Sequence, residues 1–268
     1  MFCSFPTRGN SKSFKSKVVI ITGSSSGIGA ATALKFAREG ASGIVLHGRN
    51  VAALQDIKKQ SENAGRCLTK VHICTGDITE ESVRQDLINS AIVHFGRLDV
   101  LVNNAGVGMT GRLAEASMDD FDKVFNINVR SLIALTQLAL PHLIRTKGNV
   151  VNISSGLSTK PVAIMPFYSC SKAAVDQFTK CLALDMGPEG VRVNSVNPGF
   201  VPQTAFHERQ GGSGGVSISN ADAPLTFVAL QRGGKVEEIA DAIIFIASDK
   251  AKFITGVNFL VDGGITKM

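Results

Sequence analysis

The sequence predicts an α/β fold in which a doubly wound, parallel sheet of seven strands is covered by helices on both faces. Two observations favour this fold. Seven short apolar runs, rich in β-branched residues, recur along the chain, and segments with helical periodicity separate them. Strands that are apolar on both faces are typical of a sheet buried between two layers. Their alternation with helices indicates that the strands run parallel.

The elements follow one another in a regular order. The first strand is expected over 17–22 (KVVIIT) and a helix over about 27–38; the second strand, 43–47 (GIVLH), precedes a helix over 51–63. Five more strands are expected at 70–74, 98–103, 149–154, 191–196 and 257–261. Right-handed crossovers bring the carboxyl ends of such strands to one edge of the sheet. A functional site is therefore expected in the loops at that edge.

Length and composition favour one domain. The 268 residues contain no Pro-rich, Ser-rich or acidic linker, so residues 17–268 are expected to form a single domain. The net charge is +6, and the residues before the first acid, Glu39, are basic wherever they are charged. Residues 1–16 are interpreted as a basic, flexible tail; a mitochondrial transit peptide is the alternative.

Composition also disfavours several classes of protein. No apolar run reaches the roughly 18 residues of a membrane-spanning helix, and no secretory signal is evident, so we expect a cytoplasmic protein without a membrane span. Five cysteines without a C-x-x-C pair and five histidines without metal-ligand spacing predict no metal site. One tyrosine and no tryptophan disfavour nucleic-acid binding by stacking, despite the basic charge.

A glycine-rich turn, TGSSSGIG at 22–29, joins the first strand to the first helix. Gly23 permits a tight turn, Gly27 lets an anion approach the backbone, and Gly29 lets helix and strand pack closely. The amides at the start of a helix attract a pyrophosphate. This context predicts a Rossmann-type dinucleotide site, with Ser25, Ser26 and Ile28 beside the glycines.

The end of the second strand bears on the choice of cofactor. An acidic residue there would bind both ribose hydroxyls and favour NAD, but the chain has Gly48, Arg49 and Asn50. Arg49 can form charge-assisted hydrogen bonds to a 2′-phosphate. NADP(H) is therefore the predicted cofactor, and NAD(H) is the alternative.

Tyr168 is the only tyrosine in the chain, and Lys172 follows it at the fourth position. If this segment is helical, the two side chains share one face. A neighbouring ammonium favours the phenolate, so we expect Lys172 to lower the pKa of Tyr168 toward the range of an acid–base catalyst.

Seven motifs, in order, carry a resemblance to a known family. They are TGSSSGIG, NNAG (103–106), FNINV (125–129), NISS (152–155), YSCSK (168–172), NPG (197–199) and VDGG (261–264). Together, over residues 17–264, they resemble the single-domain branch of the short-chain dehydrogenase/reductase superfamily. The resemblance implies a Rossmann fold that binds NAD(P) and interconverts a carbonyl and a secondary alcohol.

The resemblance also implies roles for a catalytic group of four residues. Tyr168 matches the acid/base, and Lys172 matches the lysine that lowers its pKa and binds the nicotinamide ribose. Ser155 matches the serine that polarises the substrate, with Ser154 as a poorer candidate. Asn128 matches the asparagine that holds a helix distortion and a water near the lysine, and Asn126 fits less well.

Further cofactor contacts follow from the same resemblance. Asn104, Ala105 and Gly106 resemble the loop beside the adenosine, and Asp77 with Ile78 resembles the adenine contact. Pro198, Gly199 and Val201 resemble the segment that positions the nicotinamide amide. The usual spacing is stretched here to PGFVPQT, which leaves open whether Thr204 reaches the cofactor.

These observations predict an NADP(H)-dependent carbonyl reductase or alcohol dehydrogenase. An NAD-dependent alcohol dehydrogenase of the same family and a catalytically silent nucleotide sensor or scaffold are the alternatives. A substrate lid is expected over about 200–231, with a mobile loop at 210–224. Its Phe206, Phe227, Val228 and Leu230 favour a lipophilic substrate, or else pack the lid onto its own domain. The final VNFLVDGG resembles that of family members that form homotetramers.

Overall fold

The structure is a computed structural model that describes residues 13–202, 204 and 225–268. Most of the basic tail lies outside the described residues. So do the centre of the expected lid, the loop at 210–224 and Phe206.

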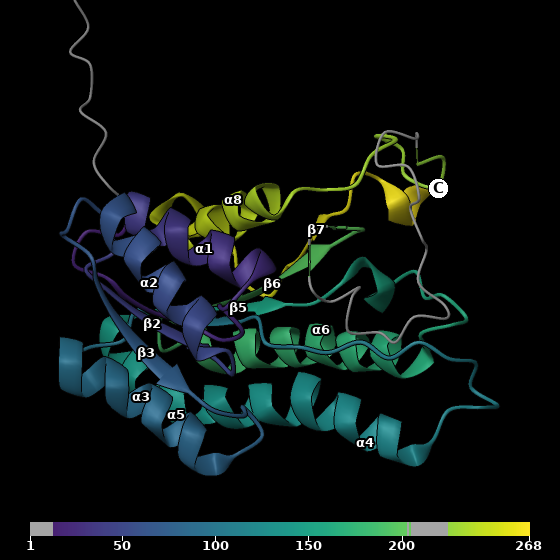
Figure 1. The fold of residues 1–268 in the computed structure, drawn as a ribbon, viewed down its shortest axis with the longest axis horizontal. Coiled ribbons are helices and arrows are strands. Elements are labelled where there is room, and N and C mark those ends of the chain that lie inside the picture. The colour runs from purple at the N-terminus through teal and green to yellow at the C-terminus, as the bar shows by residue number, and fades with distance from the viewer. Residues whose placement is uncertain (1–12, 203, 205–224) are drawn as a thin grey trace, which may run out of the picture.

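Seven parallel strands form one sheet, which confirms the predicted fold class (Figure 1). The strands are β1 (Val18–Ile21), β2 (Gly43–Gly48), β3 (Lys70–Thr75), β4 (Val100–Asn103), β5 (Asn149–Ile153), β6 (Arg192–Pro198) and β7 (Asn258–Val261). Their order in the sheet is β3-β2-β1-β4-β5-β6-β7. The order reverses between β1 and β4, and open α/β sheets bind ligands in the crevice at such a switch point.

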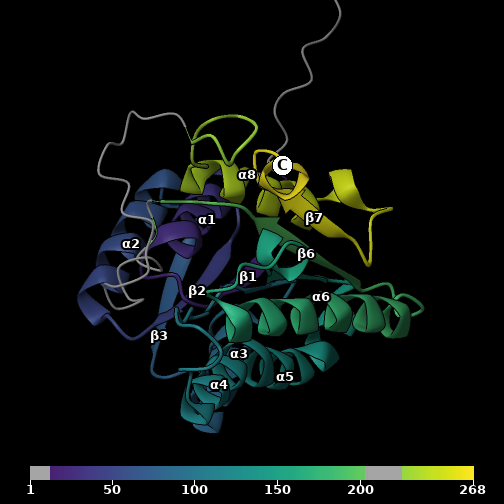
Figure 2. The ribbon, with the colours of Figure 1, turned by 90° about the vertical axis from the view of Figure 1, so that its right-hand side faces the viewer.

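Helices cover both faces of the sheet. They are α1 (Gly27–Arg38), α2 (Val51–Ala64), α3 (Glu81–Phe95), α4 (Met118–Phe125), α5 (Ser131–Thr146), α6 (Pro166–Met186) and α8 (Val236–Ala247). Short turns are the π-helix η1 (Asn126–Arg130) and the 3₁₀-helices η2 (Gly156–Ser158), η3 (Asp249–Ala251) and η4 (Ile265–Lys267). Figure 2 shows α1, α2 and α8 on one side of the sheet and α3, α5 and α6 on the other.

Alternate residues of the central strand supply the two cores. Val19 and Ile21 belong to the cluster shared with α1, α2 and α8, whereas Val18 and Ile20 belong to the cluster shared with α3, α5 and α6. Successive side chains of a strand point to opposite faces, which explains this division. Each such side chain contributes about 1.5–3 kcal/mol when fully buried. The apolar strand runs that predicted the sheet are thus the residues that hold its two layers.

One helical run is longer and more apolar than the sequence analysis suggested. Among the described residues, the continuous run Met118–Thr146 is long and apolar enough to cross a membrane, by length and composition only. Its most apolar window has a mean hydropathy of 1.2. Within this run, however, Leu135, Ala139 and Leu143 are fully buried in the core beneath the sheet.

Candidate active site

A cavity of about 1030 Å³ lies at the carboxyl ends of the strands. Its volume is at the upper end of the roughly 300–1,000 Å³ of small-molecule and cofactor sites. The structure brings the predicted cofactor residues together on its wall: Gly23, Ser25, Ser26, Gly27, Ile28, Arg49, Asn50, Asp77, Ile78, Asn104, Ala105, Gly106, Tyr168, Lys172, Pro198, Gly199, Val201 and Thr204. Ser155 also lines it. Gly29 and Asn128 lie behind the wall rather than on it.

The glycine turn has the geometry expected of an anion site. Gly23 and Gly27 adopt φ of 64° and 59°, which side chains disfavour. A Cβ at Gly29 would lie 2.5 Å from the Gly23 carbonyl oxygen and 2.6 Å from Asn104 Nδ2, so only glycine fits. Helix α1 begins here, and the side chain of its N-cap, Ser26, makes no capping hydrogen bond. The first amides of α1 are therefore available to an anion.

His47, near the end of β2, accepts two hydrogen bonds from the backbone of this turn. Its backbone oxygen accepts from Ser24 N at 2.8 Å, and its Nδ1 accepts from Gly23 N at 3.4 Å. Burial lowers the pKa of His47 to about 4, although Gly76 and Asp77 act in the opposite direction. The imidazole is therefore neutral at pH 7 and can accept the glycine amide. Sequence reasoning missed His47, although its place at a strand end, just before Arg49, was a usable signal.

The adenosine end of the cavity is bounded by the loops after β2 and β3. Arg49 is 63 % exposed, and its Nη1 lies 3.9 Å from Asp77 Oδ2. Asp77 Oδ1 accepts from the Thr79 amide at 2.9 Å, and this bond is the main cause that lowers the pKa of Asp77. Asn50 Oδ1 caps α2 by accepting from Ala53 N at 3.0 Å. Arg49 therefore keeps most of its guanidinium exposed to the cavity and solvent.

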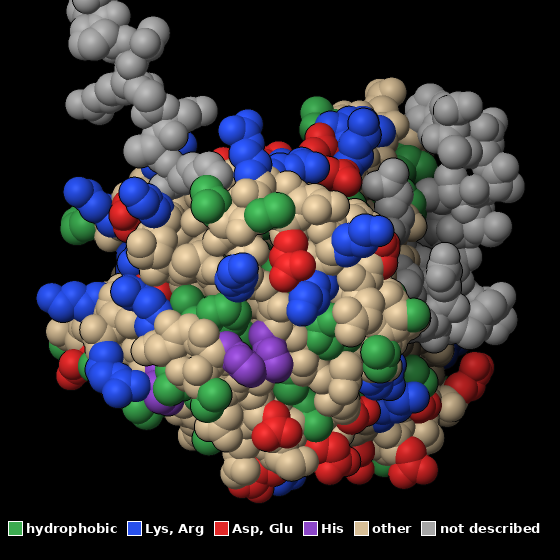
Figure 3. Space-filling model, turned by 60° about the vertical axis from the view of Figure 1, so that its left-hand side comes forward, with side chains coloured by type: hydrophobic (Ala, Val, Ile, Leu, Met, Phe, Trp, Pro, Cys, Tyr) green, Lys and Arg blue, Asp and Glu red, His purple; other side chains and the backbone are tan. Residues whose placement is uncertain are grey.

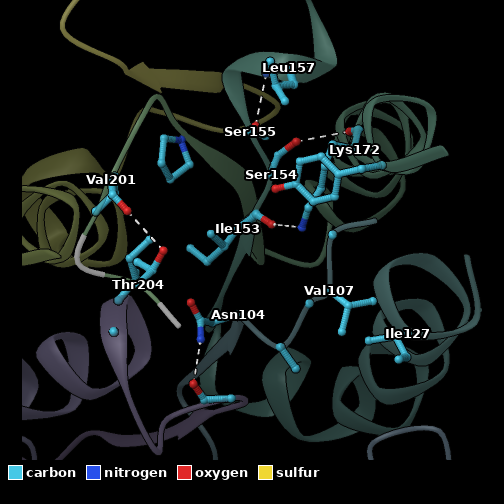
Figure 4. Close-up of a pocket in the computed structure, with 18 of the residues that line it drawn as sticks. Asn104, Val107, Ile127, Ile153, Ser154, Ser155, Leu157, Lys172, Val201 and Thr204 are labelled. Atoms are coloured by element: carbon cyan, nitrogen blue, oxygen red, sulfur yellow. Dashed lines mark hydrogen bonds between the residues drawn. The ribbon is translucent and has the colours of Figure 1, made fainter. Parts of the chain in front are cut away.

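Tyr168, Lys172 and Ser155 form one buried cluster. Pro166 starts α6, as is common at a first helical position, and the helix places Lys172 one turn after Tyr168. Lys172 Nζ lies 5.6 Å from the centre of the Tyr168 ring and donates to the Ile153 carbonyl oxygen at 2.7 Å. Figure 4 shows Lys172 reaching from α6 to the end of β5, where Ile153, Ser154 and Ser155 follow one another.

The pKa of Tyr168 differs from the prediction. Burial raises it to about 12, and a hydrogen bond with Ser155 acts against this rise. Burial also lowers the pKa of Lys172 to about 8, opposed by the charge of Asp176. The prediction that Lys172 lowers the pKa of Tyr168 is thus wrong for this structure, because the loss of water around the buried phenol favours its uncharged form. At neutral pH the phenol is protonated.

The structure distinguishes the two candidate serines and shows what the side chain of Asn128 binds. Ser155 Oγ accepts from Leu157 N at 3.1 Å, as the cap of η2, whereas Ser154 Oγ donates to the Lys172 carbonyl oxygen (Figure 4). Asn128 is buried in the π-helix η1, and its amide exchanges two bonds of 2.9 Å with the backbone of Val107. The expected helix distortion is therefore present at Asn128, whose side chain fixes the loop after β4.

Comparisons with known proteins agree with this geometry. A family model described as "short chain dehydrogenase" matches residues 17–211. The chain belongs to the short-chain dehydrogenase family. It is similar to a meso-2,3-butanediol dehydrogenase of Serratia marcescens, with 36% identity over 94% of this chain and 96% of that protein.

Two solved structures extend the similarity to the whole fold. One is a glucose dehydrogenase of Caenorhabditis elegans in its apo form, with 38% identity, a TM-score of 0.79, and 95% and 99% of the two chains covered. The other is an L-sorbose reductase from Gluconobacter frateurii, complexed with NADPH and L-sorbose, with 30% identity, a TM-score of 0.86, and 96% and 99% covered. This short-chain dehydrogenase is accordingly an oxidoreductase that acts on CH–OH groups or the corresponding carbonyls.

The remaining wall of the cavity in this short-chain dehydrogenase is mostly apolar. Its apolar side chains come from six segments: Val107, Met109, Ile127, Leu157, Val162, Ile164, Met165, Phe200, Phe227 and Ile265. Lys123 and Lys160 are the charged residues of this part. Sequence reasoning identified only Phe227 among these, because most belong to loops without periodicity.

In the described part of the expected lid, some side chains face the cavity, as a lipophilic substrate would require, and others do not. Phe227 is 40% exposed, lines the cavity and packs against Phe200 with ring centres 5.9 Å apart. Val228 is buried, and Leu230 is 64% exposed away from the cavity. Thr204 reaches the cavity and donates to the Val201 carbonyl oxygen at 3.1 Å.

Proposed function

We propose that this short-chain dehydrogenase reduces a lipophilic carbonyl compound to a secondary alcohol with NADPH, and that Tyr168 is the acid. The main support is one observation: the phenol of Tyr168 lies in the cavity wall beside Ser155 and one helical turn from Lys172, and it is protonated at neutral pH. A protonated phenol is the form required to donate to an alkoxide. The reverse reaction requires the phenolate, which this environment disfavours.

The residues present fit a nicotinamide dinucleotide. The glycine turn and the first amides of α1 suit a pyrophosphate. Beyond the turn, the lining of the site includes Arg49, which follows β2, and Tyr168 and Lys172 on α6. Since an arginine, and no acid, follows β2, the ribose end favours a 2′-phosphate. We therefore propose NADP(H) as the preferred cofactor.

The chain's own residues can each take a defined part in the reaction. Ser155 Oγ accepts from Leu157 N and bonds to Tyr168, and its hydroxyl can donate to a substrate carbonyl oxygen that takes the place of that second bond. Tyr168 donates to the same oxygen, and both bonds strengthen as negative charge develops there. When bound, the nicotinamide cofactor would supply the hydride for the carbonyl carbon. The phenolic proton then passes to the new alkoxide, and the Lys172 ammonium stabilises the phenolate that is left.

The buried position of Asn128 supports a positioning role. Its side-chain amide is hydrogen-bonded to the backbone of Val107, so we assign it no proton-transfer step. A Cβ on Gly106, which precedes Val107, would lie 3.5 Å from Lys172 Nζ. The loop after β4 is thereby kept close to the lysine. We also propose a homotetramer in the cytoplasm, in line with the sequence expectation.

The decisive experiment follows NADPH oxidation with a panel of aliphatic, aromatic and steroid-like ketones, for the wild type and Tyr168→Phe. We expect the variant to lose about 10²- to 10⁴-fold in kcat, with folding intact. Cys170→Ala, an exposed change two residues along the same helix, serves as the control. Full turnover in Tyr168→Phe would remove the assignment. Turnover with NADH alone would favour the NAD-dependent alternative, and cofactor binding without turnover would favour a silent sensor.

A further inference from the structure

Asp176 is a buried acid without a part in the mechanism above. It lies on α6, four residues after Lys172 and eight after Tyr168, so the three side chains share one face of the helix. Its exposed fraction is 5%, and that of Lys172 is 4%. Burying a carboxylate costs several kcal/mol unless hydrogen bonds or an opposite charge compensate. The groups around Asp176 therefore show what keeps it there.

The hydrogen-bond donors to Asp176 are neutral and come from β6. Asn197 Nδ2 lies 2.9 Å from Oδ2 and 3.1 Å from Oδ1, and Ser195 Oγ lies 3.1 Å from Oδ1. The same Ser195 hydroxyl also lies within reach of Asn197 Oδ1 at 2.7 Å and Asn258 Oδ1 at 3.1 Å. No ion pair within 4 Å joins Asp176 to a lysine or arginine of the described residues.

Lys172 is the complementary case, a buried cation without an ion pair in the described residues. Its Nζ donates to the neutral Ile153 carbonyl oxygen. The charge of Asp176 raises the pKa of Lys172, in opposition to the burial that lowers it. The carboxylate is thus a counter-charge one helical turn away, too far for a salt bridge but inside the same low-dielectric interior.

The other groups that face this part of α6 are neutral or solvated. From β6, η2 and η1 come Ser195, Asn197, Ser158 and Asn128. The charged side chains of α4 and η1 lie partly or fully in solvent: Asp119, Asp120, Asp122, Lys123 and Arg130. Among the residues that the structure describes, Tyr168 is the remaining titratable group beside Lys172. Asp176 is therefore the buried charge that acts on this lysine.

Asn197 connects Asp176 to the other side of the site. Its Nδ2 also lies 3.2 Å from the Ser155 carbonyl oxygen and 3.2 Å from Ser158 Oγ. Pro198 and Gly199, which line the cavity, follow it directly. The two hydrogens of one amide thus join the carboxylate on α6 to the Ser155 peptide after β5.

We propose that Asp176 is a positioning residue that acts on the reaction through two partners, as a buried counter-charge to Lys172 one helical turn away and, with Asn197, by fixing the Ser155 peptide. This inference rests on the proposed function, because it assigns Asp176 to a site in which Lys172 and Ser155 assist reduction. The carboxylate itself does not touch the substrate.

The test compares Asp176→Asn with Asp185→Asn, which removes an exposed carboxylate from the same helix. The Lys172 amine is titrated by NMR in protein carrying ¹³Cε-lysine, and its signal is assigned by its loss in Lys172→Met. We expect Asp176→Asn to lower the Lys172 midpoint by about 0.5 to 1 pH unit. The alkaline limb of the pH profile of kcat should move down equally, and kcat at pH 7 should fall about tenfold with little change in KM.

The variant Asp176→Glu distinguishes the effect of the carboxylate charge on Lys172 from the effect of side-chain length on Asn197. It keeps the carboxylate, so the Lys172 midpoint should stay near the wild-type value, while the longer side chain displaces Asn197 and lowers kcat. If Asp176→Asn does not fold, Asp176→Ser replaces it, since its hydroxyl can still accept from Asn197. Retention of the fold is checked by thermal unfolding.

The outcomes distinguish this inference from the proposed function. The inference would be overturned if Asp176→Asn left the Lys172 titration midpoint at its wild-type value and had the same kcat as Asp185→Asn. The NMR titration does not require turnover. A shifted midpoint in a protein that reduces no carbonyl would therefore support the coupling and reject the function.

Discussion

The phenol of Tyr168 and the ammonium of Lys172 show how strongly burial alters a residue that looks simple in the sequence. Both are more than nine-tenths buried, and both pKa values move toward the uncharged form. The uncharged phenol is the acid that reduction needs. The i, i+4 spacing correctly predicted that the two groups are neighbours, but the loss of water sets the direction in which their pKa values move.

Tyr168 can be titrated directly, because the chain has one tyrosine and no tryptophan. We expect little tyrosinate absorbance at pH 10, where a free phenol is half ionised, and a rise near pH 12. Since the folded pKa lies above the unfolded value, stability should be lost as the pH rises from about 10 to 12. Ser155→Ala should move the midpoint higher, because the Ser155 hydrogen bond lowers it. A wild-type midpoint at or below 10 contradicts this prediction.

Arg49 should determine the choice between the two dinucleotides. We expect Arg49→Ala to weaken NADPH binding about 10- to 100-fold, through loss of charge-assisted bonds to the 2′-phosphate. NADH binding should change by less than about threefold, since NADH lacks that group. Kd values from fluorescence titration of both cofactors, with Arg66→Ala as the control, measure the effect. If Arg49→Ala weakens the binding of NADPH and NADH by the same factor, Arg49 does not bind the 2′-phosphate.

At the level of elements, the turn between β1 and α1 depends on contacts with two other strands. The loop after β4 lies against it, since a Cβ at Gly23 would be 2.9 Å from Ala105 Cα. The end of β2 supports it through His47 and Ser24. The glycine pattern alone predicted the turn, but its neighbours follow from the strand order.

Gly29→Ala should disrupt this arrangement. The new Cβ would lie 2.5 Å from a backbone oxygen of Gly23, which has no room to move. We expect a loss of at least about 2 kcal/mol in stability and of cofactor binding, from overpacking. Gly96→Ala is the matched control: its site is open, so only the strain of φ 74° should cost about 1–2 kcal/mol. Equal Tm values and equal cofactor affinity for the two variants would contradict the packing argument.

At the level of the whole molecule, the surface shows where copies of the chain can meet. In Figure 3, basic side chains are spread as separate groups over one face, and acidic ones gather near its lower edge. Around the edge strand β7, by contrast, lie exposed apolar side chains. Phe253 is fully exposed, Leu184 is 82% exposed, and Phe245 on α8 packs near Phe259 of β7. Apolar side chains beside a sheet edge favour association.

We expect size-exclusion chromatography with light scattering to give a homotetramer, and Phe253→Asp to reduce it to a smaller species. A charge buried at an interface costs more than it gains. Leu68→Asp, in the exposed loop between α2 and β3, should leave the assembly unchanged. A monomeric wild type would reject the tetramer.

The sequence by itself determined the sheet, the glycine turn and the identity of about half of the cavity residues, because strand periodicity and motif spacing are local properties. Helix α1 has the predicted bounds, and the strands differ by one or two residues from those expected. Tertiary structure alone decided the direction of the pKa shifts of Tyr168 and Lys172, the hydrogen bond from Gly23 to His47, and the joining of Asp176 to Ser155 through Asn197. These properties depend on burial and on contacts between distant strands, and the spacing of residues along the chain specifies neither of them.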